Sequence, residues 1–232
     1  MADVIIRSYR PGDEAAVEAI TYRTGFKGED LTGRGFIDDR WLCFLTSIYY
    51  YVRYEPAHFF VAVDTGNDAV VGFIGGTTDT EAQEKNFAFK IMPRIALRTF
   101  LFTIWRYPSS FWMLMKMTRM LGSLGDRKTA AAAIQSEYPA HLHINLLPEY
   151  QGQGIGTRLM RHFEIHLAGQ GVKGVHLGTS NHNRKAVPFY HKMGFTVVSE
   201  TEAKSHPVLD DLKLFVFAKK LDAPSSNSTH QP

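Results

Sequence analysis

The sequence has a single cysteine and little that resembles a membrane segment. Cys43 has no partner for an internal disulfide, and its apolar neighbours predict a buried thiol rather than a nucleophile. The longest apolar stretch, 91–112, contains three arginines, which a membrane span of about 20 apolar residues does not tolerate. No basic region followed by an apolar core marks a secretory signal. We therefore expect a cytoplasmic protein, with a nuclear location as the alternative.

Strong charge and metal-ligand spacing are also lacking. The net charge of +3 is too small to predict nucleic-acid binding. The histidines show no ligand spacing with cysteine or carboxylates, so no metal is expected. We expect one domain over residues 1–222, followed by a disordered tail, 223–232, that is rich in small polar residues.

Hydrophobic patterning predicts a mixed α/β (α+β) domain. Period-2 and β-rich runs predict strands, and apolar residues at helical spacing predict the helices between them. A longer helical insertion is expected at about 87–121, broken near Pro93 and Pro108. The strands are expected at 4–7, 58–63, 70–77, 142–147, 174–177, 196–199 and 212–218, and the other helices at 13–23, 38–53, 154–168 and 184–193. In the helix at 154–168, Leu159, Met160, Phe163 and Leu167 are expected to point inward.

A glycine-rich turn follows the strand predicted at 142–147. Residues 151–156 are Gln-Gly-Gln-Gly-Ile-Gly. Glycines permit unusual backbone angles and leave N–H groups accessible, and the next helix adds its own free N–H groups and positive dipole end. The turn suits a pyrophosphate, although glycines selected for packing explain it equally well. Its spacing matches neither a Rossmann fingerprint nor a P-loop.

The turn resembles motif A of the GCN5-related N-acetyltransferase (GNAT) superfamily, Gln/Arg-x-x-Gly-x-Gly/Ala. A segment about thirty residues later resembles motif B of the same superfamily, Asn-x-x-Ala-x-x-Phe-Tyr-x-x-x-Gly-Phe. Two matching motifs in the family's order are stronger evidence than either alone, and the resemblance covers residues 142–195. The matching positions are Gln151, Gly154 and Gly156 in the first motif and Asn183, Ala186, Phe189, Tyr190, Gly194 and Phe195 in the second.

The resemblance implies the GNAT fold and an acetyl-CoA site. In this fold a central mixed, mostly antiparallel sheet has helices on both faces, and its fourth and fifth strands splay apart in a V. The pantetheine arm of acetyl-CoA pairs with one strand like an added strand, here through the backbones of Leu146 and Leu147. The implied cofactor-binding residues are Leu146, Leu147, Gln151, Gly152, Gln153, Gly154, Ile155, Gly156, Thr157, Asn183, Ala186, Phe189 and Tyr190.

The same resemblance implies direct acetyl transfer to an amine, with a general acid and a base. Tyr190 is the candidate acid that protonates the leaving thiolate; a purely structural role in the core is the alternative. His141 and His143 alternate on the predicted strand and resemble the paired histidines of the arylalkylamine N-acetyltransferases. Their distance to motif A is one residue shorter than in that family, which would turn them away unless a bulge compensates. His176 and Glu137 are alternative bases.

The acceptor side is less determined. The resemblance implies that the loop between the first two helices, here called the acceptor loop, lines the acceptor pocket. Asp38 and Asp39 are candidates to attract a cationic amine, although they also suit a helix cap. Between Lys85 and Lys128 the chain is basic and aromatic with one acid, Asp126. We favour helices that cover the acceptor groove or a second copy, so a homodimer stays open; a cationic lid comes next. A membrane-surface helix ranks last, and neither a membrane nor a nucleic-acid partner is expected.

The expected activity is therefore an acetyl-CoA-dependent N-acetyltransferase acting on a small amine, a peptide terminus or a lysine. A CoA-binding pseudo-acetyltransferase, resembling the C-terminal domain of eukaryotic O-GlcNAcases, is the alternative. That domain lacks an intact glycine turn. The presence of Gln151, Gly154 and Gly156 here favours the enzyme.

Overall fold

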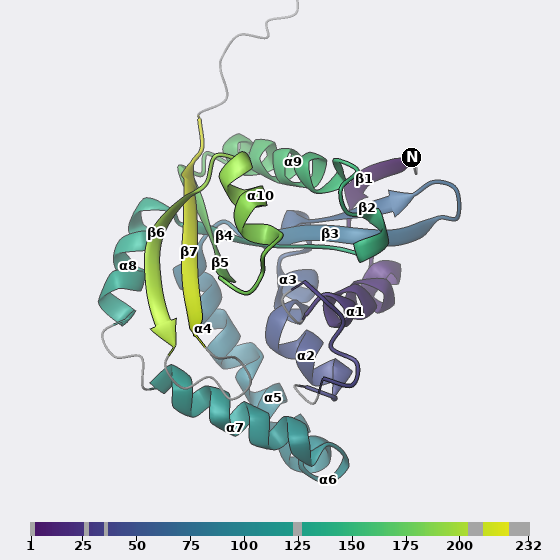
Figure 1. The fold of residues 1–232 in the computed structure, drawn as a ribbon, viewed down its shortest axis with the longest axis vertical. Helices are drawn as coiled ribbons and strands as arrows, with labels where there is room; N and C mark the ends of the chain where they lie inside the picture. The colour runs from purple at the N-terminus through teal and green to yellow at the C-terminus, as the bar shows by residue number, and fades with distance from the viewer. Residues whose placement is uncertain (1–2, 26–27, 35–36, 123–126, 204–210, 223–232) are drawn as a thin grey trace, which may run out of the picture.

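A mixed sheet forms the centre of the molecule (Figure 1). The structure, a computed structural model, describes residues 3–25, 28–34, 37–122, 127–203 and 211–222; the predicted tail lies outside them. Within these ranges the strand order is β1-β2-β3-β4-β5-β7-β6, and only β4 and β5 are parallel neighbours. This confirms the predicted sheet. The strands are β1 (Val4–Ser8), β2 (Phe59–Asp64), β3 (Ala69–Thr77), β4 (Ala140–Leu146), β5 (Gly174–Ser180), β6 (Thr196–Ala203) and β7 (Leu212–Lys220).

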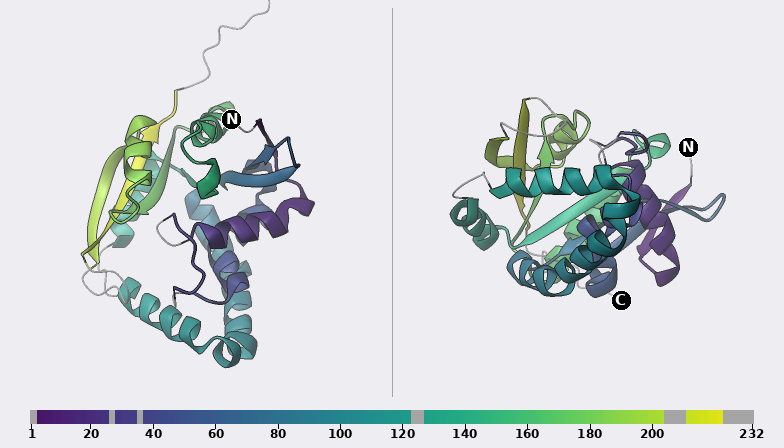
Figure 2. Two further views of the ribbon diagram at one scale, coloured as in Figure 1. Left: turned by 45° about the vertical axis from the view of Figure 1, so that its right-hand side comes forward. Right: turned by 90° about the horizontal axis from the view of Figure 1, so that it is seen from below.

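Helices cover both faces of the sheet (Figure 2). The N-terminal helices α1 (Glu14–Arg23), α2 (Arg40–Ser47) and α3 (Tyr49–Tyr54) lie on one face, and α9 (Ile155–Gly169) lies on the other. Strand β2 explains the arrangement, because its residues 59–63 are all buried and therefore need cover on both sides. Helix α10 (Ala186–Lys192) packs beside β5.

Helix α9 fixes the position of the glycine turn that precedes it. Its apolar side chains recur at helical spacing, so one face can enter the core. Each such side chain contributes about 1.5–3 kcal/mol when it is fully buried. The predicted inward residues are all fully buried, which confirms this face of the helix: Leu159, Met160, Phe163 and Leu167.

The helical insertion is longer than predicted. It begins directly after β3 and ends before β4, so the expected 87–121 covers only its middle. Pro93 and Pro108 lie in the first turns of α5 and α7, which confirms the two predicted breaks. The insertion comprises α4 (Thr80–Lys90), α5 (Met92–Arg98), a π-helical turn (Thr99–Thr103), α6 (Ile104–Arg106), α7 (Pro108–Gly122) and α8 (Arg127–Glu137).

The insertion is joined to the N-terminal helices by a buried carboxylate. Asp39 accepts hydrogen bonds from Arg98 Nη2 (2.7 Å) and Thr103 Oγ1 (2.7 Å), and its Oδ1 caps α2 by accepting from Leu42 N (3.1 Å). Ser110 Oγ accepts from the backbone N–H of the preceding residue, Asp38 (2.8 Å). None of the described helices has the length and hydrophobicity needed to cross a membrane.

Candidate active site

The parallel strands β4 and β5 pair only at their beginnings. The register joins Ala140 to Val175 and His141 to His176, and no later pair follows, although β4 and β5 continue to Leu146 and Ser180. The strands therefore diverge toward their carboxyl ends. The parts of the sheet that contain β1–β4 and β5–β7 turn away from each other in Figure 2. This is the V expected of the fold.

One strand of the V directs backbone groups toward the other arm. Leu147 N donates to Val71 O on β3 (3.0 Å), and Leu147 O accepts from Tyr150 N (3.0 Å). Because backbone groups alternate in direction along a strand, the N–H and C=O of Leu146 point the other way, into the V. The N–H and the C=O of Leu147 both have backbone partners, whereas Leu146 O accepts only from the side chain of Gln151 (2.9 Å). Of the two leucines expected to pair with the pantetheine arm, Leu146 is therefore the better placed.

The glycine turn has the shape that an anion site requires. Gly152 and Gly154 have φ angles of +77° and +79°, in the left-handed region that other residues avoid. A Cβ at either position would meet no atom within 4 Å, so close packing does not explain these glycines. Gly154 is the N-cap of α9, and helix geometry leaves the first N–H groups, from Ile155 to Thr157, without intrahelical acceptors.

The two sequence motifs meet across the V. Gln151 Nε2 donates to Leu146 O (2.9 Å), and its Oε1 accepts from Lys185 Nζ (3.0 Å), so one side chain connects both arms. A Cβ on Gly156 would lie 3.6 Å from the ring of Phe189 in α10. Lys185 places a cation beside the glycine turn. The sequence alone did not identify it, because motif B leaves this position variable.

Asn183 occupies the end of the second arm. Its Oδ1 accepts from the backbone N–H of Ala186 at the start of α10 (3.3 Å). A Cβ on Gly28 would lie 3.5 Å from the same oxygen, so the loop between α1 and α2 reaches the open end of the V. The acceptor-side loop and the expected pantetheine contact therefore adjoin one another.

Tyr190 combines a buried ring with an unengaged hydroxyl. Its ring centroid lies 5.5 Å from those of Phe189 and Phe217 and 6.1 Å from that of Phe195. Burial raises the pKa of the Tyr190 hydroxyl, so it stays protonated at neutral pH. Among the described residues this hydroxyl has no hydrogen-bond partner. The expected core role is present, and a proton donor remains available beside it.

His141 and His143 share one face of β4, as predicted. The Tyr51 hydroxyl on α3 lies 2.5 Å from His141 Nε2, and its ring centroid lies 5.2 Å from that of His143. Asn145, on the same face, donates to Thr24 Oγ1 (2.6 Å) on the N-terminal helical side. The β3–β4 register runs without a shift, so the bulge that would compensate for the shorter distance to motif A is absent from β4. Tyr51 on α3 contacts both rings, so the two histidines nevertheless face α1–α3, the side of the loop between α1 and α2.

The hydrogen bonds around His141 determine its tautomer. Thr80 Oγ1 donates its proton to Pro139 O (2.7 Å), so it must accept from His141 Nδ1 (3.0 Å). His141 Nε2 is then unprotonated and accepts from the Tyr51 hydroxyl. His143 has no hydrogen-bond partner among the described residues, so its ring lone pair is available. The sequence did not identify Tyr51, because nothing distinguishes it from the adjacent Tyr49 and Tyr50.

Burial keeps all three histidines of this region neutral. Burial lowers the pKa of His143 to about 4. It also lowers the pKa of His141 well below the usual 6.5, and the electrostatic interaction of His141 with His143 and His176 lowers that pKa further. Burial also lowers the pKa of His176, which donates from Nδ1 to Tyr138 O (2.7 Å). A neutral imidazole can accept a proton. Glu137, by contrast, pairs with Lys220 at the surface (3.0 Å).

Acidification is expected to lower the stability of the fold through the partly buried His143. Its folded pKa of about 4 lies below the usual 6.5, so the unfolded chain takes up the proton first as the pH falls. The free energy of unfolding is therefore highest above about pH 6.5 and decreases toward pH 4, by roughly 2 kcal/mol between pH 7 and 5. Urea unfolding at both pH values measures this loss. His143→Gln should reduce this loss of unfolding free energy, whereas His191→Gln, at an exposed position, should not. Equal losses in the two variants would contradict the assignment of the loss to His143.

The acidic residues predicted for the acceptor side have other partners. Asp39 is 1% exposed. Burial raises its pKa, but hydrogen bonds from Arg98 and Thr103 outweigh this effect, so the net pKa lies below the ordinary value. The capping alternative is confirmed for Asp39, and its carboxylate is not free to attract an amine. Asp38 accepts from Ser109 Oγ at the surface (2.8 Å).

Cys43 is buried, and burial raises the pKa of its thiol to about 12, which fits the expected structural role rather than a nucleophile. Within the described part of the chain, no group of three or more His, Cys, Asp or Glu side chains is arranged to hold a metal ion.

Comparison with known proteins identifies the family. Residues 29–195, more than half of the chain, match the sequence model of the acetyltransferase (GNAT) family. The chain therefore belongs to the GNAT acetyltransferase family. The resemblance inferred from the glycine turn and the Asn183 segment is confirmed.

Solved structures agree with this assignment. The protein SsHAT is 29% identical, with a TM-score of 0.67, and the match covers 95% of this chain and 99% of that one. The Salmonella typhimurium protein yncA, solved with its cofactor acetyl-CoA, is 15% identical with a TM-score of 0.57, covering 99% and 100%. The Escherichia coli ribosomal-protein-S18-alanine N-acetyltransferase is 14% identical with a TM-score of 0.54, covering 98% and 100%. At such low identity the last two support the fold alone.

Proposed function

We propose that the protein is an acetyl-CoA-dependent N-acetyltransferase that transfers the acetyl group directly to an amine. The observation that carries this proposal is the divergence of β4 and β5 after His141 and His176, with the left-handed glycine turn at the end of β4. The V offers strand-like backbone groups, and the turn offers N–H donors to an anion. A pantetheine diphosphate needs both along its length.

The residues of this site divide between the two substrates. The backbone of Leu146 would pair with the pantetheine arm, and residues 151–157 with Lys185 nearby would hold the pyrophosphate. Acetyl-CoA supplies an activated thioester carbonyl. The histidine face of β4 lies toward the acceptor loop. Much of the rate enhancement can come from holding the amine and the carbonyl together.

The reaction requires two proton transfers. The amine nitrogen attacks the thioester carbonyl, a C–N bond forms, and the C–S bond breaks. His143 accepts the proton that the amine loses, because its lone pair is not engaged. Tyr190 donates a proton to the departing sulfur, because burial keeps its hydroxyl protonated. His141, with Tyr51 and Thr80, forms a second, hydrogen-bonded proton path beside His143.

Tyr51→Phe is expected to lower kcat/KM for the amine about tenfold without changing the affinity for acetyl-CoA. The substitution removes the hydroxyl that donates a hydrogen bond to His141 Nε2 while keeping the aromatic ring beside both histidines. Steady-state kinetics with one amine measures the effect. Tyr54→Phe, at the end of the same helix, is the matched control. An unchanged kcat/KM in the Tyr51 variant would show that the path through His141 plays no part.

A screen of amines with detection of the released CoA thiol tests the proposed function. The panel should include arylalkylamines, polyamines, peptide amino termini and lysine peptides, and CoA binding should be measured separately by calorimetry. Thiol release with one amine class supports the enzyme. Tight CoA binding without turnover on any amine would support the pseudo-acetyltransferase instead, and no CoA binding would overturn both.

A further inference from the structure

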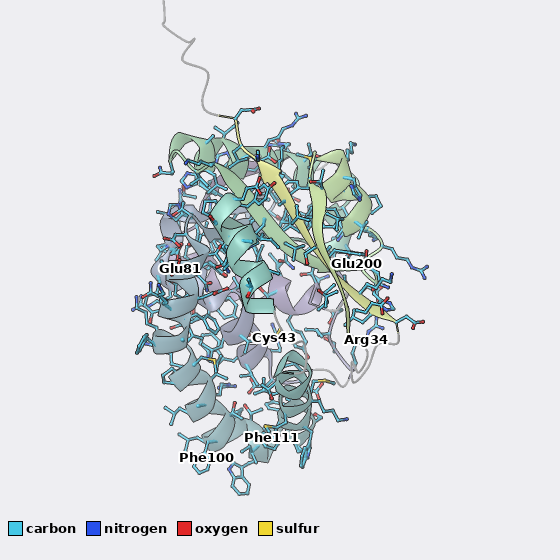
Figure 3. The ribbon with its side chains drawn as sticks, turned by 90° about the vertical axis from the view of Figure 1, so that its left-hand side faces the viewer. Arg34, Cys43, Glu81, Phe100, Phe111 and Glu200 are labelled. Carbon is cyan, nitrogen blue, oxygen red and sulfur yellow. The ribbon has the colours of Figure 1, made fainter. Side chains whose placement is uncertain are left out.

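The insertion carries an outward surface that is apolar and basic, which we name the apolar–basic surface. Its aromatic members are among the most exposed large hydrophobic side chains of the described residues: Phe89 is 84% exposed, Trp105 79% and Phe100 68%. Figure 3 shows Phe100 at the end of the helical extension that lies farthest from the strands. The surface consists of Phe89, Met92, Leu97, Phe100, Leu101 and Trp105 with the basic residues Lys90, Arg94 and Arg106.

The fold does not account for this surface. The same helices already bury an inner face, where Ile91, Ile95 and Thr103 are 0%, 7% and 0% exposed. A helix at the edge of a globular domain needs one apolar face, with polar residues on the opposite side. This segment is apolar on both sides, so its outer face must have been selected for something other than the core. Exposed large apolar side chains concentrated on one segment in this way indicate an interaction site.

The charges on the surface indicate the chemistry of the partner. Lys90, Arg94 and Arg106 pair with no carboxylate among the described residues; the ion pairs of this segment are Lys85–Glu81 and Arg98–Asp39. Residues 86–125 contain no Asp or Glu at all. The partner should therefore be apolar and anionic at once.

We infer that the apolar–basic surface docks on a lipid bilayer with anionic headgroups, the partner that the sequence alone ranked last. Exposed Trp and Phe side chains suit the region between headgroups and acyl chains, and Lys and Arg beside them attract anionic lipid. A second copy of the chain fits less well. A symmetric dimer through this surface would bring the same cations against each other with no acid to neutralise them.

Hydrogen bonds connect the insertion, and with it the apolar–basic surface, to the loop between α1 and α2. Arg98 and Thr103 hold Asp39, and Ser110 holds the backbone of Asp38, at the end of the loop between α1 and α2. Gly28 in that loop adjoins Asn183 at the open end of the V. The docked surface is thus joined rigidly to the acceptor side.

Vesicle co-sedimentation of the full chain tests the inference. The protein should sediment with phosphatidylcholine vesicles that contain about 30% phosphatidylserine and stay in solution with phosphatidylcholine alone. Combined K90Q, R94Q and R106Q substitutions should weaken binding about a hundredfold, since each cation near an anionic surface contributes about tenfold or less. Combined F100S, L101S and W105S substitutions should abolish it. Ile165→Ser, which removes an apolar side chain that is 74% exposed on α9, should change nothing.

Two outcomes would overturn the inference. One is no sedimentation with anionic vesicles at low salt. The other is a dimer in sedimentation equilibrium that the F100S, L101S and W105S substitutions dissociate, together with no vesicle binding, which would assign the surface to a second copy. Unchanged circular dichroism and thermal unfolding in each variant ensure that loss of binding is not loss of fold.

Discussion

Tyr190→Phe is expected to lower kcat about a hundredfold while leaving the fold and the affinity for acetyl-CoA intact. The ring is held by Phe189, Phe195 and Phe217, and Phe preserves those contacts. Only the hydroxyl is lost, and among the described residues it supports no hydrogen bond. A positioned general acid typically contributes about 10²–10⁴-fold. Steady-state kinetics together with the melting temperature separates the chemical effect from a structural one.

A control variant and a more reactive thioester make the Tyr190 test specific. Tyr9→Phe, at the end of β1, removes an equivalent hydroxyl beside Phe59 and should leave kcat unchanged. Poor leaving groups depend most on a proton donor, so the Tyr190 variant should recover part of its activity with a thioester whose thiol is more acidic than CoA. An unaltered kcat in Tyr190→Phe would mean that the thiolate leaves without this acid.

Gly154→Ala is expected to weaken acetyl-CoA binding by about ten- to a hundredfold. Gly154 has a φ of +79°, and a left-handed conformation costs other residues roughly 1–2 kcal/mol. An alanine turn that relaxes in the free protein has to regain this conformation on binding, which alone lowers the affinity by about tenfold. The added methyl group also enters the open space beside the turn, where the pyrophosphate is proposed to lie. Isothermal titration with CoA measures the loss, and KM for the amine should change little.

The other end of the same helix supplies the control. Gly169, the last residue of α9, lies outside the left-handed region, and a methyl group added there would meet no atom within 4 Å, so Gly169→Ala should bind CoA normally. A variant at Gly152, which shares the left-handed conformation, should resemble Gly154→Ala. Equal CoA affinity in Gly154→Ala and Gly169→Ala would remove the turn from the binding site.

The parts of the fold that local sequence determines were predictable. The glycine turn, the inward face of α9 and the helix cap at Asp39 each depend on residues a few positions apart, and the structure confirms them. The insertion was predicted too short because its flanking helices α4 and α8 carry polar sequences with little amphipathic pattern. Their starts depend on local signals such as Asp79, which caps α4 through Ala82 N (3.0 Å).

The contacts of the candidate site that join distant segments were not predictable. Tyr51 and Thr80 meet His141 from elements ninety and sixty-one residues away along the chain. The direction in which the backbone of Leu147 points depends on its pairing with Val71. Likewise, Asp39 could be recognised as a cap but not as the partner of Arg98. Such relations depend on strand register and helix phase, which a single sequence does not fix.

Thr80 and Pro139 join the two ends of the insertion, and closing this loop lowers the entropy of the chain. Thr80 donates to Pro139 O through both its backbone N–H (2.8 Å) and its hydroxyl (2.7 Å). Closing a loop costs only about 0.6 kcal/mol more for each doubling of its length, so this segment costs roughly 2–3 kcal/mol more than a four-residue turn. Chain length is thus a weak constraint on what stands between β3 and β4. The stronger constraint is Asp39, because a shortened segment without Arg98 would leave a buried carboxylate without its cation.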